Sequence, residues 1–270
     1  MADMDFSDRA VLVTGAARGL GKQIARALHA RGARVALNDL SADAIAAAVA
    51  DLGAGPRLAG AAADISTAAG CEGAVHAALE HFGRLDVLVN NAAINWEMPI
   101  AAHTEEIWDK HVDTILKGSF FCAKAAIPAL KAKRGNIVNI ASELGLHPIV
   151  NNVAYCAAKG GVVNLTRALA VELAPEIRVN CIAPGAMLVE VARFYLAEAK
   201  ADGFALIGLD EASLVERIAR TARNPADVAD IIVLAETTAL HRQRTGVAKS
   251  PEITSEIVEK SIRRVIVTPA

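Results

Sequence analysis

Short apolar runs alternate with longer alanine-rich stretches that read as helices along most of this chain. One run, residues 85–89, is almost continuously apolar, which is typical of a strand buried on both faces of a parallel sheet. This alternation favours a doubly wound α/β architecture, because parallel neighbouring strands need a crossover between them. We expect strands at residues 9–14, 34–38, 58–63, 85–89, 136–140 and 177–182, and helices at residues 19–31, 42–52, 68–82, 105–133 and 152–173. Ser41 and Thr104 are the expected N-caps of two of these helices.

Composition narrows the classes of protein that the chain can represent. It has 270 residues, 53% of them hydrophobic, and no linker stretch, so we expect one domain over residues 1–270. A net charge of −2 lacks the positive surface of a nucleic-acid-binding protein. No apolar run approaches the roughly 18 residues of a membrane span, and the acidic first residues do not resemble a secretory signal. The four cysteines show neither metal-site nor redox-pair spacing, so we expect no metal and a reduced, cytoplasmic protein.

A glycine-rich turn lies between the first expected strand and the first expected helix. Gly15, Gly19 and Gly21 allow a tight turn and the close approach of a phosphate, which the helix N-terminus favours electrostatically. Asp39 closes the second expected strand, where a carboxylate accepts hydrogen bonds from ribose hydroxyls and repels a 2′-phosphate. Arg18 leaves two alternatives open, since it could pair with a 2′-phosphate or neutralise Asp39. The turn predicts a dinucleotide site for NAD, with NADP as the alternative.

Tyr155 and Lys159 are separated by one helical turn, and Ser142 lies thirteen residues before the tyrosine. A phenol has an unperturbed pKa near 10, so bringing it near 7 requires roughly 4 kcal/mol. A cation about 4 Å away supplies roughly that much at an intermediate dielectric. The spacing therefore suits a tyrosine that acts as an acid–base near neutral pH.

Together these features resemble the classical short-chain dehydrogenase/reductases, over residues 6–185. The other motifs that carry the resemblance are Asp64-Ile65, Asn90-Asn91-Ala92-Ala93, Asn139-Ile140-Ala141-Ser142 and Asn180-Cys181-Ile182-Ala183-Pro184-Gly185. The resemblance implies a Rossmann-type fold and an NAD(P)-dependent oxidoreductase that moves a hydride between the nicotinamide and a secondary alcohol or ketone. In such a protein Tyr155 would be the acid–base, Ser142 would hydrogen-bond the substrate oxygen, and Lys159 would hold the nicotinamide ribose and lower the pKa of Tyr155. The implied cofactor-binding residues are Gly15, Arg18, Gly19, Leu20, Gly21, Asp39, Asp64, Ile65, Asn91, Tyr155, Lys159, Pro184 and Gly185.

Three positions depart from the family pattern. Ile115 stands where the family has an asparagine that supports a water-mediated proton relay, so the relay would need a backbone carbonyl, His111, Asp113 or another route. We expect a widened helical turn at Ile115 that frees such a carbonyl, whereas an undistorted helix there would indicate a broken relay. Val189 replaces a threonine near the nicotinamide amide, and the usual glycine-rich ending is missing from an atypical tail at residues 240–270. These departures favour one rival, a non-catalytic nucleotide-binding protein, which the intact Ser142, Tyr155 and Lys159 disfavour. A third alternative is an epimerase or lyase that uses bound NAD.

The substrate is a small molecule of unassigned identity. Residues 187–215 would form a lid over it, and the apolar side chains there favour an apolar or aromatic-containing substrate. Trp96, Glu143 and His147 flank the expected pocket. The family resemblance also implies a homo-oligomer, tetramer or dimer, paired through the helices at residues 105–133 and 152–173.

Overall fold

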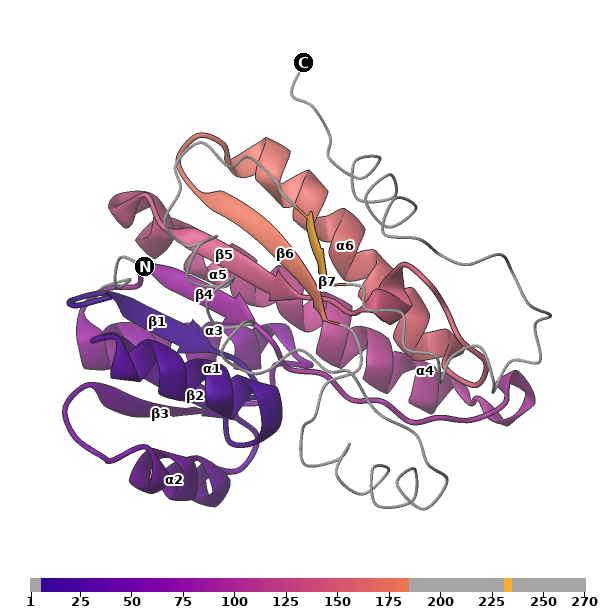
Figure 1. Ribbon diagram of the computed structural model, residues 1–270, viewed down its shortest axis with the longest axis horizontal. Coiled ribbons are helices and arrows are strands. Elements are labelled where there is room, and N and C mark those ends of the chain that lie inside the picture. Colours follow the sequence, from indigo (N-terminus) through magenta and orange to yellow (C-terminus); the bar gives the residue numbers. More distant parts are fainter. Residues whose placement is uncertain (1–5, 185–230, 235–270) are drawn as a thin grey trace.

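A single parallel sheet organises the protein. The structure is a computed structural model that describes residues 6–184 and 231–234. Seven parallel strands follow the order β3-β2-β1-β4-β5-β6-β7 (Figure 1). They are β1 (Ala10–Val13), β2 (Arg34–Asp39), β3 (Leu58–Ala62), β4 (Val87–Asn90), β5 (Asn136–Ile140), β6 (Arg178–Pro184) and β7 (Ile231–Leu234). Because the order reverses between β1 and β4, the sheet has a crevice at the carboxyl ends of these strands, which is where such folds bind ligands.

Helices connect the strands, as the alternation predicted. They are α1 (Gly19–Ala30), α2 (Ala42–Asp51), α3 (Ala68–Phe82), α4 (Glu105–Val112), α5 (Gly118–Lys133) and α6 (Val153–Leu173), with shorter turns η1 (Ile100–Ala102), η2 (Asp113–Lys117) and η3 (Glu143–Gly145). The expected ends of strands and helices differ from the observed ones by at most two residues. The Rossmann-type doubly wound sheet is therefore confirmed.

Alternate residues of each strand supply the two faces of the core. Val11 and Val13 of β1 pack with α1 and α2, whereas Ala10 and Leu12 pack with α3, α5 and α6. All four side chains are fully buried. A strand covered on both faces has no polar side to display, which explains the continuous apolar runs in the sequence.

The expected caps are present at the beginnings of two helices. Ser41 Oγ accepts a hydrogen bond from the amide of Ala44 at 3.1 Å, and Thr104 Oγ1 accepts one from Ile107 at 3.2 Å. Each hydroxyl satisfies one of the amides that a helix N-terminus leaves without an intrahelical partner.

The long helix expected at residues 105–133 contains a widened turn. Between α4 and α5, η2 is a π-helix, and the amide of Gly118 bonds to the carbonyl of Asp113, five residues back. Ile115 lies inside this turn. The expected distortion at Ile115 is thereby confirmed, and such π-turns are frequent at functional sites.

Several sequence predictions fall outside the described residues. These are Gly185 and Val189, the lid at residues 187–215 and the tail at residues 240–270. Within residues 6–184 and 231–234, no helix is both long enough and apolar enough to cross a membrane.

Candidate active site

Residues that are far apart in sequence meet at the carboxyl edge of the sheet. Because all strands run in one direction, every segment that follows a strand emerges at the same edge. The segments contributed there are the glycine turn after β1, Asp39 on β2, Asp64 and Ile65 after β3, Asn91 after β4, Ser142 after β5 and Pro184 on β6. The fold thus brings the predicted cofactor and substrate residues together.

Two glycines let the phosphate turn pack against the segment that follows β4. A Cβ on Gly15 would lie 2.8 Å from the Cα of Ala92, and Gly15 has a φ of +63°. A Cβ on Gly21 would lie 2.2 Å from the carbonyl oxygen of Gly15 and 2.5 Å from Asn91 Nδ2. Any side chain at either position would push the turn away from β4, so these glycines set the shape of the site.

The third glycine and the start of α1 fit an anionic group. Gly19 has a φ of +55°, and no atom lies within 4 Å of where its Cβ would be. Arg18, the N-cap residue, makes no side-chain cap hydrogen bond, and the first turn of α1 contains no acidic residue. The first amides of a helix lack intrahelical acceptors and carry the positive end of its dipole. This arrangement suits the pyrophosphate of a dinucleotide.

Asp39 is fixed at the rim of the turn. Its Oδ2 accepts a hydrogen bond from the amide of Ala17 at 3.1 Å, and its Oδ1 accepts one from Leu40 at 2.9 Å. Each carboxylate oxygen keeps a lone pair for a ribose hydroxyl. Among residues 6–184 no ion pair joins Arg18 to Asp39, so the described geometry does not contain the neutralisation considered from sequence.

Thr14 is a site residue that sequence reasoning missed. It is 1% exposed, and its Oγ1 accepts hydrogen bonds from the amides of Asn91 at 3.0 Å and Ala92 at 3.1 Å. The Asn91 side chain in turn donates to the carbonyls of Thr14 at 2.9 Å and Gly15 at 3.2 Å. Asn91 thus clamps the glycine turn to β4, and the signal for Thr14 was its place directly before Gly15.

The adenine-side residues divide into an exposed carboxylate and a buried side chain. Asp64 is exposed, and its Oδ1 accepts a hydrogen bond from the amide of Ser66 at 2.9 Å. Ile65 is 7% exposed and packs in the core under α3. Leu20, in the first turn of α1, is partly buried against the core on the opposite face of the sheet. Asp64 therefore has the access that a nucleotide base requires, whereas Ile65 and Leu20 contribute shape.

Ser142, Tyr155 and Lys159 lie together where β5 ends against α6. Lys159 is 2% exposed, and its Nζ donates to the carbonyl of Ile140 at 2.6 Å. The ammonium lies 5.8 Å from the centroid of the Tyr155 ring. Burial raises the pKa of Tyr155, and the Ser142 hydroxyl is close enough to act on the phenol in the opposite direction. The structure therefore assembles the predicted cluster from two different elements.

Burial controls the pKa values in this cluster. It lowers the pKa of Lys159 to about 8, against a small opposing effect of Cys181. It also raises the pKa of Tyr155, more than the hydrogen bond from Ser142 lowers it. The expected lowering of the Tyr155 pKa is therefore wrong for the described structure, because removing the phenolate from water outweighs its stabilising contacts. The phenol form is the favoured form of Tyr155 here.

A close backbone contact holds η3 against α6. A Cβ on Gly145 would lie 2.7 Å from the carbonyl carbon of Lys159 and 2.9 Å from the amide nitrogen of Gly160. Ser142 is the N-cap residue of η3, and its Oγ accepts a hydrogen bond from the amide of Leu144 at 3.2 Å. Gly145 thus helps to set where Ser142 lies relative to Tyr155. The sequence analysis missed this glycine, and its place three residues after Ser142 was the only signal.

The structure reduces the alternatives for the proton relay at Ile115. His111 donates from Nδ1 to the carbonyl of Ile107 at 2.7 Å, and its Nε2 accepts from the amide of Trp96 at 3.2 Å, which assigns its tautomer. Asp113 is paired with Lys117 at 3.1 Å. Both side chains named from the sequence are therefore already engaged.

Of the groups named from the sequence for the proton relay, a backbone carbonyl remains, and the carbonyl of Ile115 lies in the π-turn. It accepts a hydrogen bond from Ser119 Oγ at 2.6 Å, and a carbonyl oxygen has a second lone pair. The side chain of Ile115 is 1% exposed and packs with Ala158 and Tyr155. The π-turn thus places an apolar side chain next to Tyr155, and the Ile115 carbonyl at this turn accepts from the hydroxyl of Ser119.

Hydrogen bonds among buried polar groups link β4 and β5 to α5 and α6. Asn90 donates to Asn139 Oδ1 at 2.9 Å and to the carbonyl of Ser119 at 3.2 Å. Asn139 donates to Thr166 Oγ1 at 2.9 Å, and Thr166 donates to the carbonyl of Val162 at 2.8 Å. These contacts give Asn90 a structural role that links neighbouring strands.

The residues expected to flank the substrate lie around this cluster. Trp96 is 41% exposed, and its indole meets the His111 ring edge-on at 5.5 Å. His147 donates its amide to the carbonyl of Glu143 at 2.7 Å, in the segment that follows Ser142. These contacts hold the backbone at Trp96, Glu143 and His147 in place.

An open-sheet α/β fold with a phosphate turn at its carboxyl edge defines a nucleotide-binding protein. The family model described as short chain dehydrogenase matches residues 9–199. The chain therefore belongs to the short-chain dehydrogenase/reductase family, whose members are oxidoreductases that bind nicotinamide nucleotides.

Named relatives and solved structures agree with this assignment. The chain is 42% identical to a subunit of (2S)-[(R)-hydroxy(phenyl)methyl]succinyl-CoA dehydrogenase of Thauera aromatica, over 67% of this chain and 74% of that protein. It is 40% identical to D-threitol dehydrogenase of Mycolicibacterium smegmatis, over 70% of this chain and 75% of that protein. A short-chain dehydrogenase/reductase structure from Brucella melitensis, described as a glucose/ribitol dehydrogenase, has a TM-score of 0.77 at 33% identity and covers 85% of this chain and 95% of its own.

Proposed function

We propose that this protein is an NAD(P)-dependent dehydrogenase or reductase that interconverts a secondary alcohol and a ketone. The observation that carries the proposal is the cluster of Ser142, Tyr155 and Lys159 at the same sheet edge as the glycine turn. A protein that only bound a nucleotide would have no use for this cluster. The relatives named above act, by their names, on hydroxyl-bearing compounds of different sizes, which supports an alcohol as the substrate class.

Each residue of the cluster has a separate role in the proposal. Tyr155 holds the proton that is exchanged with the substrate oxygen, and Ser142 donates a hydrogen bond to that oxygen as negative charge develops on it. Lys159 holds the nicotinamide ribose and replaces the proton on Tyr155. The nicotinamide supplies the hydride acceptor or donor when it is bound.

NAD is the proposed cofactor. The Asp39 carboxylate, held by two backbone amides at the rim of the turn, supports this choice because it would repel a 2′-phosphate. The proton relay is proposed to run through a water bound to the carbonyl of Ile115. The engaged states of His111 and Asp113 support this route over the side-chain routes.

The test is turnover with a panel of secondary alcohols and ketones, followed by nicotinamide absorbance with NAD and with NADP. Tyr155→Phe should abolish turnover on any substrate that the panel reveals, while the binding of NAD, measured by calorimetry, stays within about threefold. A Tyr155→Phe variant with near-normal turnover would remove the tyrosine from the proposal. NAD binding without turnover on a broad panel would favour the non-catalytic rival.

A homo-oligomer, dimer or tetramer, is proposed as the assembly. Phe120 on α5 and Val171 on α6 are 40% and 79% exposed, which supports a contact through these two helices. Light scattering at micromolar concentration should give a multiple of the chain mass, and a monomeric mass would contradict the assembly. A cytoplasmic location is also proposed, since all four cysteines are free thiols, three of them buried.

A further inference from the structure

A cavity of about 400 Å³ lies at the amino ends of the strands, on the sheet edge opposite the candidate active site. It is lined by Ser7, Asp8, Ala30, Gly32, Arg34 and Arg57. Its volume falls within the range of small-molecule sites. Two of its six lining residues are arginines, from the beginning of β2 and from the segment before β3.

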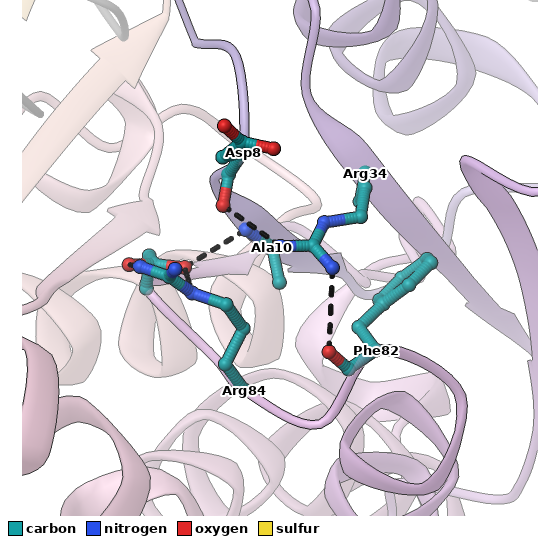
Figure 2. A network of polar contacts seen from close by, with 6 residues as sticks. Asp8, Ala10, Arg34, Phe82 and Arg84 are labelled. Carbon is teal, nitrogen blue, oxygen red and sulfur yellow. Dashed lines mark hydrogen bonds and ion pairs between the residues drawn. The ribbon is translucent and has the colours of Figure 1, made fainter.

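Neither arginine has a carboxylate partner among residues 6–184. Arg34 donates to the carbonyl oxygens of Asp8 at 3.0 Å and Phe82 at 3.4 Å, and its Nε is buried without a partner (Figure 2). Arg57 donates from one terminal nitrogen to the carbonyls of His29 at 3.0 Å and Ala33 at 3.4 Å. A guanidinium has five N–H donors, so both residues keep donors beyond these contacts.

A neighbouring arginine shows how the chain neutralises a guanidinium when it does so internally. Arg84 forms a two-point contact with Asp86, at 2.8 Å from Nε and 2.5 Å from a terminal nitrogen. This contact raises the pKa of Arg84. Asp86 is 3% exposed and also accepts from the amide of Ala10 at 2.9 Å, so it is committed to that pair. Within residues 6–184, a carboxylate thus pairs with Arg84, but none lies within 4 Å of Arg34 or Arg57.

The walls of the cavity are compatible with a small tetrahedral anion. Gly32 has a φ of +94°, and a Cβ there would lie 2.7 Å from Ser7 Oγ, so the wall carries no side chain at that position. The Asp8 carboxylate is exposed and lies on the far side of that residue from the Arg34 guanidinium in the view of Figure 2. Only the backbone oxygen of Asp8 faces Arg34. Arg57 is exposed and Arg34 is half-buried, and both line the cavity.

We propose that Arg34 and Arg57 form a binding site for a phosphate group, either inorganic phosphate or the phosphate of a small monoester, at the amino edge of the sheet. Arginine is suited to this ligand because its planar fork makes paired, charge-assisted hydrogen bonds to phosphate oxygens. The competing interpretation is that both arginines only cap the carboxyl ends of α1 and α3, whose last carbonyls they contact. The two interpretations differ in whether an anion binds.

His29 provides a local reporter. Its pKa is lowered, mainly by burial and secondly by the positive charge of Arg57. An anion bound to Arg57 would offset that charge and raise the pKa of His29. A phosphate bound at the glycine turn would not offset the charge of Arg57. A rise in the pKa of His29 therefore distinguishes binding at Arg57 from binding at the glycine turn.

The experiment is a titration of the full chain with inorganic phosphate and, in parallel, with glycerol 3-phosphate, followed by the NMR signals of the histidine rings and by calorimetry. The variants are Arg57→Gln and, as the matched control, Arg26→Gln, which removes an exposed arginine that pairs with Asp51. Arg57 is exposed, so its variant is expected to fold, and circular dichroism verifies this.

Phosphate should raise the His29 pKa in the natural chain and in Arg26→Gln. In Arg57→Gln the response should disappear, and the affinity should fall about tenfold, as expected for the loss of a charge-assisted contact. Tighter binding of inorganic phosphate assigns the free anion, and tighter binding of glycerol 3-phosphate assigns a monoester. An unmoved His29 with both ligands, or equal binding by Arg57→Gln and Arg26→Gln, would overturn the proposal and leave the arginines as helix caps. The outcome does not depend on enzymatic activity.

Discussion

Replacing Gly145 by alanine tests whether the contact between η3 and α6 sets the geometry of the active site. The added Cβ would lie 2.7 Å from the carbonyl carbon of Lys159, whereas ordinary van der Waals contact begins at 3.4 Å. The two segments must therefore separate by about 0.7 Å. Both atoms that the Cβ would meet most closely on α6 are backbone atoms of a 21-residue helix, so η3 is the part that moves.

The size of the effect follows from that displacement. Ser142 is coupled to η3 through its hydrogen bond to the amide of Leu144, so it moves with the turn. A misplacement of about 1 Å in a reacting group costs on the order of a hundredfold in rate. We expect kcat to fall between tenfold and a hundredfold, and overpacking to lower the free energy of unfolding by about 1–3 kcal/mol. NAD binding should change little, because Gly145 is not part of the glycine turn.

The assay measures kcat and KM on the best substrate from the panel, NAD affinity by calorimetry and stability by urea unfolding. Gly73→Ala on α3 is the matched control, since no atom lies within 4 Å of the added Cβ. That variant should keep full activity and gain about 0.5–1 kcal/mol from better helix propensity. If Gly145→Ala folds and turns over as fast as Gly73→Ala, the reasoning about η3 is refuted.

Four further predictions concern the cofactor, the relay and pH. Asp39→Ser should reduce the preference for NAD over NADP at least tenfold in kcat/KM, and an unchanged preference would show that Asp39 does not select the cofactor. Ile115→Asn should lower the free energy of unfolding by about 3–5 kcal/mol, because an amide replaces a fully buried apolar side chain. The substitution should not raise kcat, and a large gain in kcat would mean that the relay needs the asparagine. Because burial lowers the pKa of Lys159 from 10.5 to about 8, the unfolded chain binds more protons between these values, so stability should rise by about 3 kcal/mol as pH increases through that window. Lys159→Met should lack this rise in urea unfolding at paired pH values, and an equal rise in both proteins would contradict the shift. Because the pKa of Tyr155 is raised, kcat/KM for alcohol oxidation should increase toward alkaline pH; a flat profile would argue against the tyrosine as the base.

The order of elements and the edge at which the motifs meet could be predicted from the sequence. Apolar runs such as residues 85–89 are specified by local burial on two faces, and caps such as Ser41 and Thr104 are short-range features. Once parallel strands are inferred, Asp39 and Ser142 must emerge at the same sheet edge, because each follows a strand of the same direction. The π-turn at Ile115 was also predicted, from the need for a carbonyl acceptor.

The seventh strand and several contacts could not be predicted. β7 is only four residues long and is separated from β6 by a long segment, so no local pattern marks it. The roles of Thr14 and Gly145 come from atoms that lie close in space but in different parts of the chain. Neither role has a periodicity that could reveal it.

The sequence by itself determined the family, the parallel doubly wound character of the sheet and the chemical types present at the active site, because these depend on local periodicity and on motifs of fixed spacing. Only the tertiary structure decided the solvation, protonation and interaction partners of those groups. Lys159 is deprived of water, Tyr155 is kept protonated, and His111 and Asp113 are already committed to other partners. Likewise, in the part of the chain that the structure describes, Arg84 pairs with a carboxylate, whereas Arg34 and Arg57 contact only backbone carbonyls. Desolvation and ion pairing depend on distances between residues that are remote in sequence, and only the packed fold sets those distances.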